Sequence, residues 1–160
     1  MNKIARISPI IAQGIPNLRV LNLAYNSISD VTPLYSANLD LLEVLDLSNN
    51  AISNLTSEIA YTMPSLSSLN LENNGIQKLP TELGFMKLKA IKIDGNPLKL
   101  INRAIIDKGT VTIMDFLRNR HVGNPPTDLA CMKPKVEIID NPIPEPQANI
   151  IRNNDYQYRR

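Results

Sequence analysis

The chain has 160 residues, of which 43% are hydrophobic but only 4% aromatic, and it has no tryptophan, so its core must be aliphatic. A net charge of +2 is too small to favour nucleic acid, an acidic membrane surface or a polyanionic substrate as the partner. Cys131 is the only cysteine, which excludes an internal disulfide. Residues 1–16 resemble no signal peptide and no apolar run reaches the roughly 20 residues that span a bilayer, so we expect a cytoplasmic protein without a membrane segment.

One sequence line returns four times between residues 18 and 96, with Leu or Ile at three fixed offsets before an asparagine. The four lines are Leu18-x-x-Leu21-x-Leu23-x-x-Asn26, Leu42-x-x-Leu45-x-Leu47-x-x-Asn50, Leu66-x-x-Leu69-x-Leu71-x-x-Asn74 and Leu88-x-x-Ile91-x-Ile93-x-x-Asn96. Their asparagines are 24, 24 and 22 residues apart, and this line at this period is typical of a leucine-rich repeat. Residues 1–100 are therefore predicted to form an α/β solenoid, with short parallel strands on its concave face and loops or short helices on its convex face.

The asparagine that ends each line is predicted to be structural. Its amide carries both donors and an acceptor, so it can satisfy backbone groups of its own turn and of the neighbouring repeat. We expect a ladder made of Asn26, Asn50, Asn74 and Asn96. This structural role is favoured over a catalytic one.

Strand alternation predicts which side chains the concave face presents to a partner. One column contains Asn22, Asp46, Asn70 and Lys92, the next contains Ser48, Glu72 and Asp94, and Tyr25, Asn49 and Asn73 follow the strands. The partner-binding residues proposed from this pattern are Asn22, Tyr25, Asp46, Asn49, Asn70, Glu72, Asn73, Lys92 and Asp94. The alternative is a polar face that only contacts water.

The start of the chain matches the second half of a repeat. Asn2-x-Ile4-x-x-Ile7-x-x-Ile10 is in phase, since Asn2 lies 24 residues before Asn26, but the strand that should precede it is missing. We therefore expect further repeats upstream in the native chain.

In the return path after the second strand, Leu55, Ile59, Met63 and Leu66 have a spacing that suits a short helix.

Residues 101–120 are predicted to form a C-terminal cap of two helical pieces. Gly109 can adopt the left-handed conformation that ends the first piece, and Thr110 or Thr112 can cap the second. Five apolar side chains would cover the last repeat, namely Ile105, Ile106, Ile113, Phe116 and Leu117, while the basic side chains would face water.

Residues 121–160 differ in composition from the repeats. They are rich in proline and asparagine and contain an apolar run at Val136–Ile139, which favours an extended or disordered tail. The alternative is a peptide arm that adds to a partner or folds back on the array.

The end of the array resembles a narrower group. Its segments Asp94-Gly95-Asn96-Pro97-Leu98, Arg103-Ala104-Ile105-Ile106-x-Lys108-Gly109-Thr110 and Phe116-Leu117-Arg118-x-Arg120 resemble the closing region of intracellular leucine-rich repeat proteins related to leucine-rich repeat-containing protein 40. Asn102 departs from that pattern, which often has arginine there. The resemblance implies a cytoplasmic, non-enzymatic array whose C-terminal end is intact and whose N-terminal part is missing.

The sequence offers no convergent set of catalytic groups. His121 and Cys131 are the only histidine and cysteine, no glycine-rich phosphate loop occurs, and no metal-ligand spacing is present. We therefore expect no enzyme, cofactor or metal, but a protein–protein interaction scaffold. The alternatives are a regulatory or targeting subunit of an enzyme such as a phosphatase, a nucleic-acid-associated protein, and the repeat segment of a larger enzyme.

Overall fold

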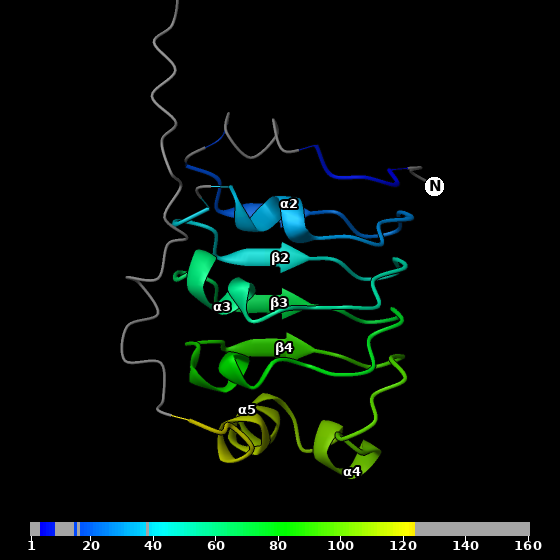
Figure 1. The fold of residues 1–160 in the computed structure, drawn as a ribbon, viewed down its shortest axis with the longest axis vertical. Helices are drawn as coiled ribbons and strands as arrows, with labels where there is room; N and C mark the ends of the chain where they lie inside the picture. The colour runs from blue at the N-terminus through cyan, green and yellow to red at the C-terminus, as the bar shows by residue number, and fades with distance from the viewer. Residues whose placement is uncertain (1–3, 9–14, 16, 38, 124–160) are drawn as a thin grey trace, which may run out of the picture.

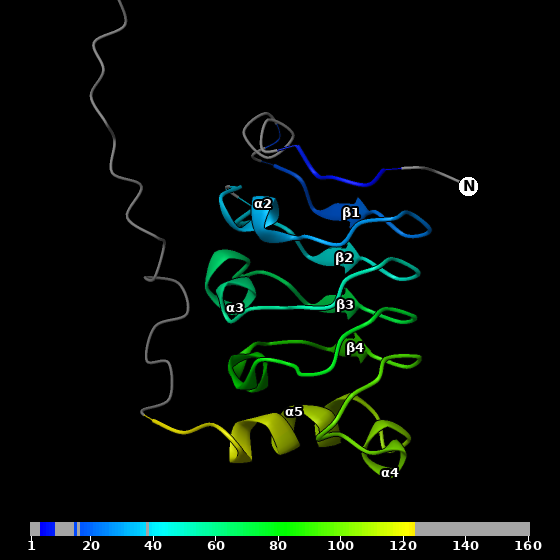
Figure 2. The same cartoon turned by 45° about the vertical axis from the view of Figure 1, so that its right-hand side comes forward.

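The computed structural model describes residues 4–8, 15, 17–37 and 39–123, which form a stack of repeats closed by two helices (Figure 1). Four three-residue strands, β1 (Val20–Asn22), β2 (Val44–Asp46), β3 (Ser68–Asn70) and β4 (Ala90–Lys92), pair in parallel in that order. Return segments carry helix α2 (Thr32–Tyr35), helix α3 (Glu58–Thr62) and the 3₁₀ helix η1 (Thr81–Phe85), all on one side of the stack (Figures 1 and 2). The predicted α/β solenoid is confirmed.

An aliphatic core fills the space between the strands and the return segments. Leu45, Leu69 and Ile91 are in register on adjacent strands, and each is at most 5% exposed. Each buried side chain of this kind contributes roughly 1.5–3 kcal/mol to the free energy of folding. Leu21 of the first strand is only partly buried, so the core is less complete at that end of the described stack.

The asparagine that ends each line joins two repeats through its side-chain amide. Asn74 is 8% exposed, and its Oδ1 accepts the backbone N–H of Ile52 of the preceding return segment at 3.0 Å. Its Nδ2 donates to the Leu71 carbonyl at 3.1 Å and to the Leu47 carbonyl of the preceding repeat at 2.9 Å.

The other asparagines follow the same arrangement. Asn50 accepts from the N–H of Ile28 and donates to the Leu23 carbonyl, and Asn96 accepts from Ile76 and donates to the Leu71 carbonyl. Asn26 accepts from Ile4, and its Nδ2 donates to the carbonyls of Leu23 and Ala24 in its own turn. Three of these amides thus contact the strand end of the preceding repeat as well as its return segment.

Two helices, α4 (Arg103–Ile106) and α5 (Thr110–Asn119), cover the last repeat at the lower end of the stack in Figure 1. Ile113 and Leu117 are buried and Ile105, Ile106 and Phe116 are partly buried against the core. Met114, which the sequence analysis did not include in this set, is also buried.

Gly84 of η1 allows α5 to lie against the backbone of the last return segment. A Cβ added at Gly84 would lie 2.6 Å from the Arg118 nitrogen and 2.9 Å from the Met114 carbonyl oxygen, both backbone atoms that cannot move independently of their helix. The Arg118 guanidinium also donates to the Gly84 carbonyl at 2.8 Å. The position therefore requires a residue without a side chain.

The expectation that Thr110 caps the second helix is wrong. Gly109, with φ of 85°, precedes α5, and no side chain caps this helix. The Thr110 hydroxyl instead accepts the N–H of Ile91 at 3.2 Å, because β4 is the edge strand and its outward N–H needs an acceptor. At α4, the Asn102 side chain accepts the N–H of Ile105 at 3.1 Å and so caps the helix.

Both ends of the chain lie partly outside the described residues. Ile7 belongs to the core, and the Ile4 carbonyl accepts the N–H of Ser27 at 3.0 Å, so residues 4–8 pack on the first repeat. Asn2 and Ile10 are not among the described residues, and neither is the tail beyond Gly123. The predicted half repeat from Asn2 to Ile10 therefore lies only partly within the described residues, and the predicted extended or disordered tail lies almost wholly outside them.

Replacing Asn74 with alanine should destabilise the array more than the same change at Asn26. Asn74→Ala leaves the N–H of Ile52 and the Leu47 and Leu71 carbonyls without their partner in a buried place, at a cost of about 2–4 kcal/mol. Asn26→Ala should cost about 1 kcal/mol, because its amide is partly exposed. Urea unfolding followed by circular dichroism measures both values. Equal losses of free energy of unfolding would contradict the conclusion that the asparagine in the interior of the stack contributes more than the one at its end.

A methyl group at Gly84 should separate the cap from the last repeat. We expect Gly84→Ala to lower the free energy of unfolding by about 1–3 kcal/mol, because the added Cβ meets the backbone of α5. Gly75→Ala is the matched control, since its nearest atom would be 3.4 Å away and its φ is not positive, and it should change stability by less than about 0.5 kcal/mol. The midpoints of urea unfolding are compared between wild type and the two variants. A midpoint for Gly84→Ala equal to that of Gly75→Ala would contradict the close contact between η1 and α5.

Candidate functional site

The strands present one continuous surface, here named the sheet face, which is the face predicted to be concave. Strand register aligns Asn22 with Asp46, Asp46 with Asn70, and Asn70 with Lys92. A second row aligns Val20, Val44, Ser68 and Ala90 in the same way. Four of the nine residues proposed to bind a partner, Asn22, Asp46, Asn70 and Lys92, thus form one row on this surface.

Three residues of the first row also stabilise the turns that follow their strands. The Oδ1 atoms of Asn22, Asp46 and Asn70 accept the backbone N–H two residues later, at 3.0, 2.9 and 3.1 Å. Such Asx turns hold the strand end in a fixed conformation. Lys92 has no side-chain acceptor, so the row loses this turn contact in the fourth repeat and gains an exposed ammonium group.

A column of left-handed residues lies immediately beyond the strands. Tyr25, Asn49 and Asn73 have φ of 57°, 55° and 55°, and Gly95 has φ of 71°. The Asn73 amide donates to Asn49 Oδ1 at 3.1 Å, and a Cβ at Gly95 would lie only 2.2 Å from Asn73 Oδ1. Asparagine and glycine suit this conformation, whereas tyrosine is an uncommon residue for it.

Tyr25 is therefore the unusual member of this column, and it is 64% exposed. An exposed aromatic ring held on an uncommon backbone conformation is a feature that recurs at binding positions. It lies at the N-terminal end of the described sheet face.

The charged groups of the sheet face divide into paired and unpaired side chains. Arg19 pairs with Glu43 beside the strands, and Asp94 pairs with Arg103 of α4 at 3.0 Å. The Glu72 carboxylate and the Lys92 ammonium group make no side-chain hydrogen bond or ion pair within the described residues. Those two groups are consequently available to a ligand without breaking an internal contact.

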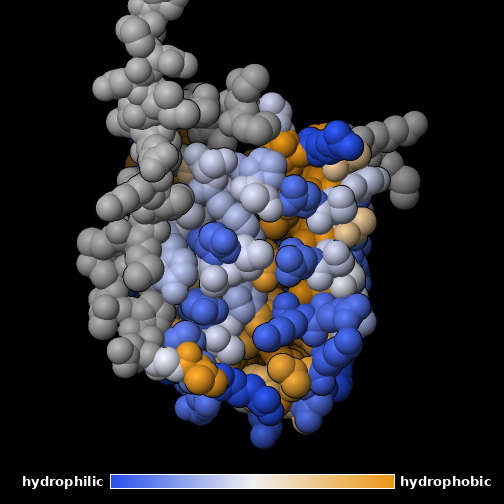
Figure 3. Space-filling model, viewed as in Figure 1, coloured by the Kyte–Doolittle hydropathy of each residue, from blue (hydrophilic) through white to orange (hydrophobic). Residues whose placement is uncertain are grey.

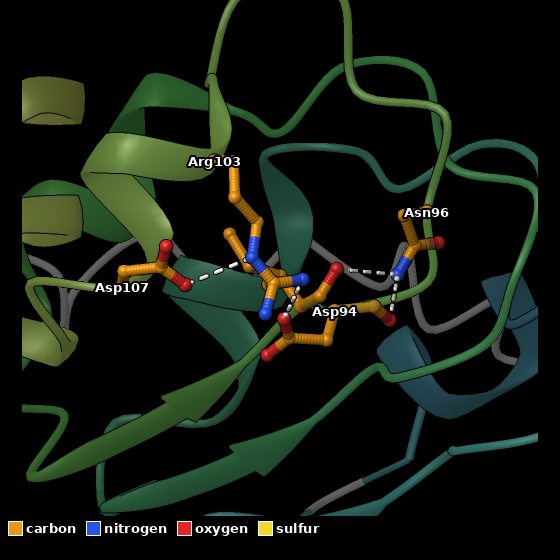
Figure 4. Close-up of polar contacts among 5 residues, drawn as sticks. Asp94, Asn96, Arg103 and Asp107 are labelled. Carbon is orange, nitrogen blue, oxygen red and sulfur yellow. Dashed lines mark hydrogen bonds and ion pairs between the residues drawn. The ribbon is translucent and has the colours of Figure 1, made fainter.

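Figure 4 shows how the cap reaches the edge of this face. The Arg103 guanidinium lies between Asp94 and Asp107, with distances of 3.0 and 2.8 Å between the charged atoms. Arg103 was expected only to face water; it is exposed, but it also forms an ion pair with Asp94. The four-residue spacing of Arg103 and Asp107 is the signal that could have indicated an ordered arginine.

Ser48 does not lie on the exposed surface as expected, since it is 5% exposed. The chain turns inward at this point around Asn50, whose Nδ2 donates to the Ser48 carbonyl at 3.1 Å. Glu72 and Asp94, which occupy the same position in later repeats, are partly exposed.

Groups with shifted pKa values lie away from the sheet face. Hydrogen bonds from Thr32 lower the pKa of Asp30, which precedes α2. Burial raises the pKa of Tyr35 and of Tyr61, and the nearby Glu82 adds to the shift at Tyr61. His121 contacts the Thr81 hydroxyl at 3.0 Å and the Phe85 ring at 5.1 Å between centroids, both in η1.

The described part of the chain contains no cluster of three or more His, Cys, Asp or Glu side chains suited to a metal ion. In the same residues, no helix has the length and apolarity needed to cross a bilayer. Cys131 lies outside the described residues.

Comparison with known proteins identifies the repeat. The leucine-rich repeat family model matches residues 1–52 and 40–98. A solved leucine-rich repeat protein of Leptospira interrogans is 30% identical, with a TM-score of 0.58 over 67% of this chain and 27% of that one. The chain thus spans about a quarter of that structure, and none of the curated protein sequences matches it significantly.

Asp46 and Glu72 should differ in what they contribute to folding. Asp46→Ala removes the Asx turn to Ser48 and should lower the free energy of unfolding by about 0.5–1.5 kcal/mol. Glu72→Ala removes a side chain without an internal partner and should change it by less than about 0.5 kcal/mol. Thermal unfolding of both variants tests this distinction, and a large loss at Glu72 would mean that its carboxylate serves the fold.

Proposed function

The chain belongs to the leucine-rich repeat family, and we propose that it is a non-enzymatic scaffold that binds a partner protein through its sheet face. Leucine-rich repeat domains generally mediate protein–protein interactions. The observation that carries the proposal for this chain is the pair Glu72 and Lys92, two charged side chains of opposite sign that have no side-chain partner within the described residues. Lys92 ends β4, and Glu72 lies two residues beyond β3.

Preorganisation supports this use of the sheet face. The asparagine amides and the Asx turns hold the backbone of each strand end, so little conformational entropy remains to be lost when a partner binds. Interfaces concentrate their binding energy in aromatic and arginine residues, and Tyr25 and Arg19 lie at one end of the face. The partner would therefore contact the charged pair and extend toward Tyr25.

We also propose where this scaffold acts and what kind of assembly it could join. The single cysteine and the resemblance of residues 94–120 to the group of leucine-rich repeat-containing protein 40 support a cytoplasmic protein. A regulatory or targeting subunit of an enzyme such as a phosphatase would use the same face and is the alternative form of this function.

A charge exchange on the sheet face should remove the partner without unfolding the chain. The double variant Glu72→Arg/Lys92→Glu keeps the net charge and should weaken capture of a sheet-face partner by about tenfold or more, because both contacts become repulsive. Immobilised wild type and variant would be compared by quantitative mass spectrometry of the proteins retained from a cell lysate, followed by a Kd measurement with the purified partner.

The matched control is Glu58→Arg/Lys99→Glu, the same exchange at exposed positions of the return segments. Proteins lost with the sheet-face variant and retained with this control are the expected result. Capture of the same proteins by all three chains would show that the sheet face is not the binding surface.

A further inference from the structure

A second surface lies on the opposite side of the stack from the strands. A groove of about 540 Å³ runs between the return segments of the last repeats and the C-terminal part of α5. Its apolar lining comes from Leu55, Leu79, Leu98, Ile101, Phe116 and Leu117. Figure 3 shows hydrophobic surface exposed as a band along the stack, with hydrophilic side chains on both sides, reaching the end where α5 lies in Figure 1.

Part of the apolar lining of the groove remains exposed. Leu100 on its edge is 49% exposed, and Phe116 is only partly buried although it belongs to the covering helix. Leu55, Leu79, Ile101 and Leu117 form the buried floor of the groove, whereas Leu98, Leu100 and Phe116 remain in contact with water. Partly exposed apolar side chains at the rim of a recess favour an occupant that covers them.

Basic groups border this apolar surface. Lys78 and Arg120 both line the groove, and the Arg120 guanidinium lies 4.7 Å from the centroid of the Phe116 ring. Glu82 is the only carboxylate among the lining residues. A peptide with branched apolar side chains and acidic neighbours would therefore match the groove in both hydrophobicity and charge.

The chain itself carries such a peptide close by. His121 and Val122 line the groove, Val122 is 94% exposed, and the sequence continues from there into residues 124–160. Within that stretch, Val136-Glu137-Ile138-Ile139-Asp140 combines three branched apolar residues with two carboxylates. Residues 124–135 separate it from Gly123 and can span about 40 Å, enough to return to a groove that begins at Val122.

We propose that residues 136–140 of this same chain bind in the groove and cover its apolar lining. A tether of this length gives an effective concentration in the millimolar range, so even a weak contact is well populated. The other apolar run, Leu129–Met132, is separated from Gly123 only by residues 124–128, which include Pro125 and Pro126. Two prolines extend so short a tether and oppose its return to the groove.

The test uses the full-length chain and the methyl signals of Leu79, Ile101 and Leu117 in two-dimensional NMR spectra. Ile138→Asp/Ile139→Asp should release the segment and shift these signals, while leaving Leu45 and Leu69 of the strands unchanged. Adding a synthetic peptide of residues 133–142 to this variant should restore the wild-type positions saturably. The matched control, Ile150→Asp/Ile151→Asp, makes the same change in another apolar pair of the tail and should leave the groove signals in place.

Three results would overturn the proposal. Groove signals that are identical in wild type and the Ile138→Asp/Ile139→Asp variant would show that the segment does not bind there. Shifts caused instead by Leu129→Asp/Met132→Asp would assign the groove to the other run. Signals that depend on protein concentration between about 10 and 500 μM would indicate that the tail of a second copy, rather than the same chain, occupies the groove, since a tethered contact is independent of dilution.

Discussion

The structure depends on one side-chain amide placed once per repeat. Each strand end must turn sharply toward the return path, and this turn leaves backbone N–H and carbonyl groups inside an aliphatic interior, where an unpaired group is costly. Asn74 satisfies three such groups from two repeats, with distances between 2.9 and 3.1 Å. A smaller side chain would leave them unpaired, and a hydroxyl could not offer the same donors and acceptor, which is why the same residue returns at this position.

The asparagine side-chain amides also affect the surface, because they leave the neighbouring side chains of the turn free to point away from the core. Asn50 and Asn74 form hydrogen bonds with the buried backbone groups of the turn. The side chains of Asp46 and Asn70 can therefore lie on the sheet face, where each accepts the backbone N–H of an Asx turn. The fourth repeat departs from this scheme with Lys92 and Gly95. It is also the repeat that meets the cap, whose Arg103 takes Asp94 as an ion-pair partner.

The two faces of the stack differ in chemistry because they are built by different parts of each repeat. Strand residues alternate strictly, so the sheet face carries a regular polar row, Asn22 to Lys92, beside a mainly apolar row, Val20 to Ala90, over the core. The return segments contain short α-helices in two repeats and a 3₁₀ helix in a third, so they are less regular than the strands. Gly84 brings α5 close at one point, while Phe116 and Leu100 remain partly exposed along the groove. The sheet face and the groove therefore differ both in regularity and in the side chains they expose.

The sequence by itself determined the fold class, the strand positions and the asparagine at the end of each line. These follow from the spacing of apolar residues within each line and from its return every 22 to 24 residues. Chain spacing also placed Asn22, Asp46, Asn70 and Lys92 in one row. Contacts between segments far apart in the chain were decided only by the tertiary structure. Thr110 pairs with Ile91 rather than with its own helix, Ser48 is buried, and Gly84 meets α5 at distances that no local pattern encodes. The physical reason is that periodicity specifies which side of a repeat a residue takes, whereas the distance between repeats and cap depends on the volumes of all the side chains packed between them.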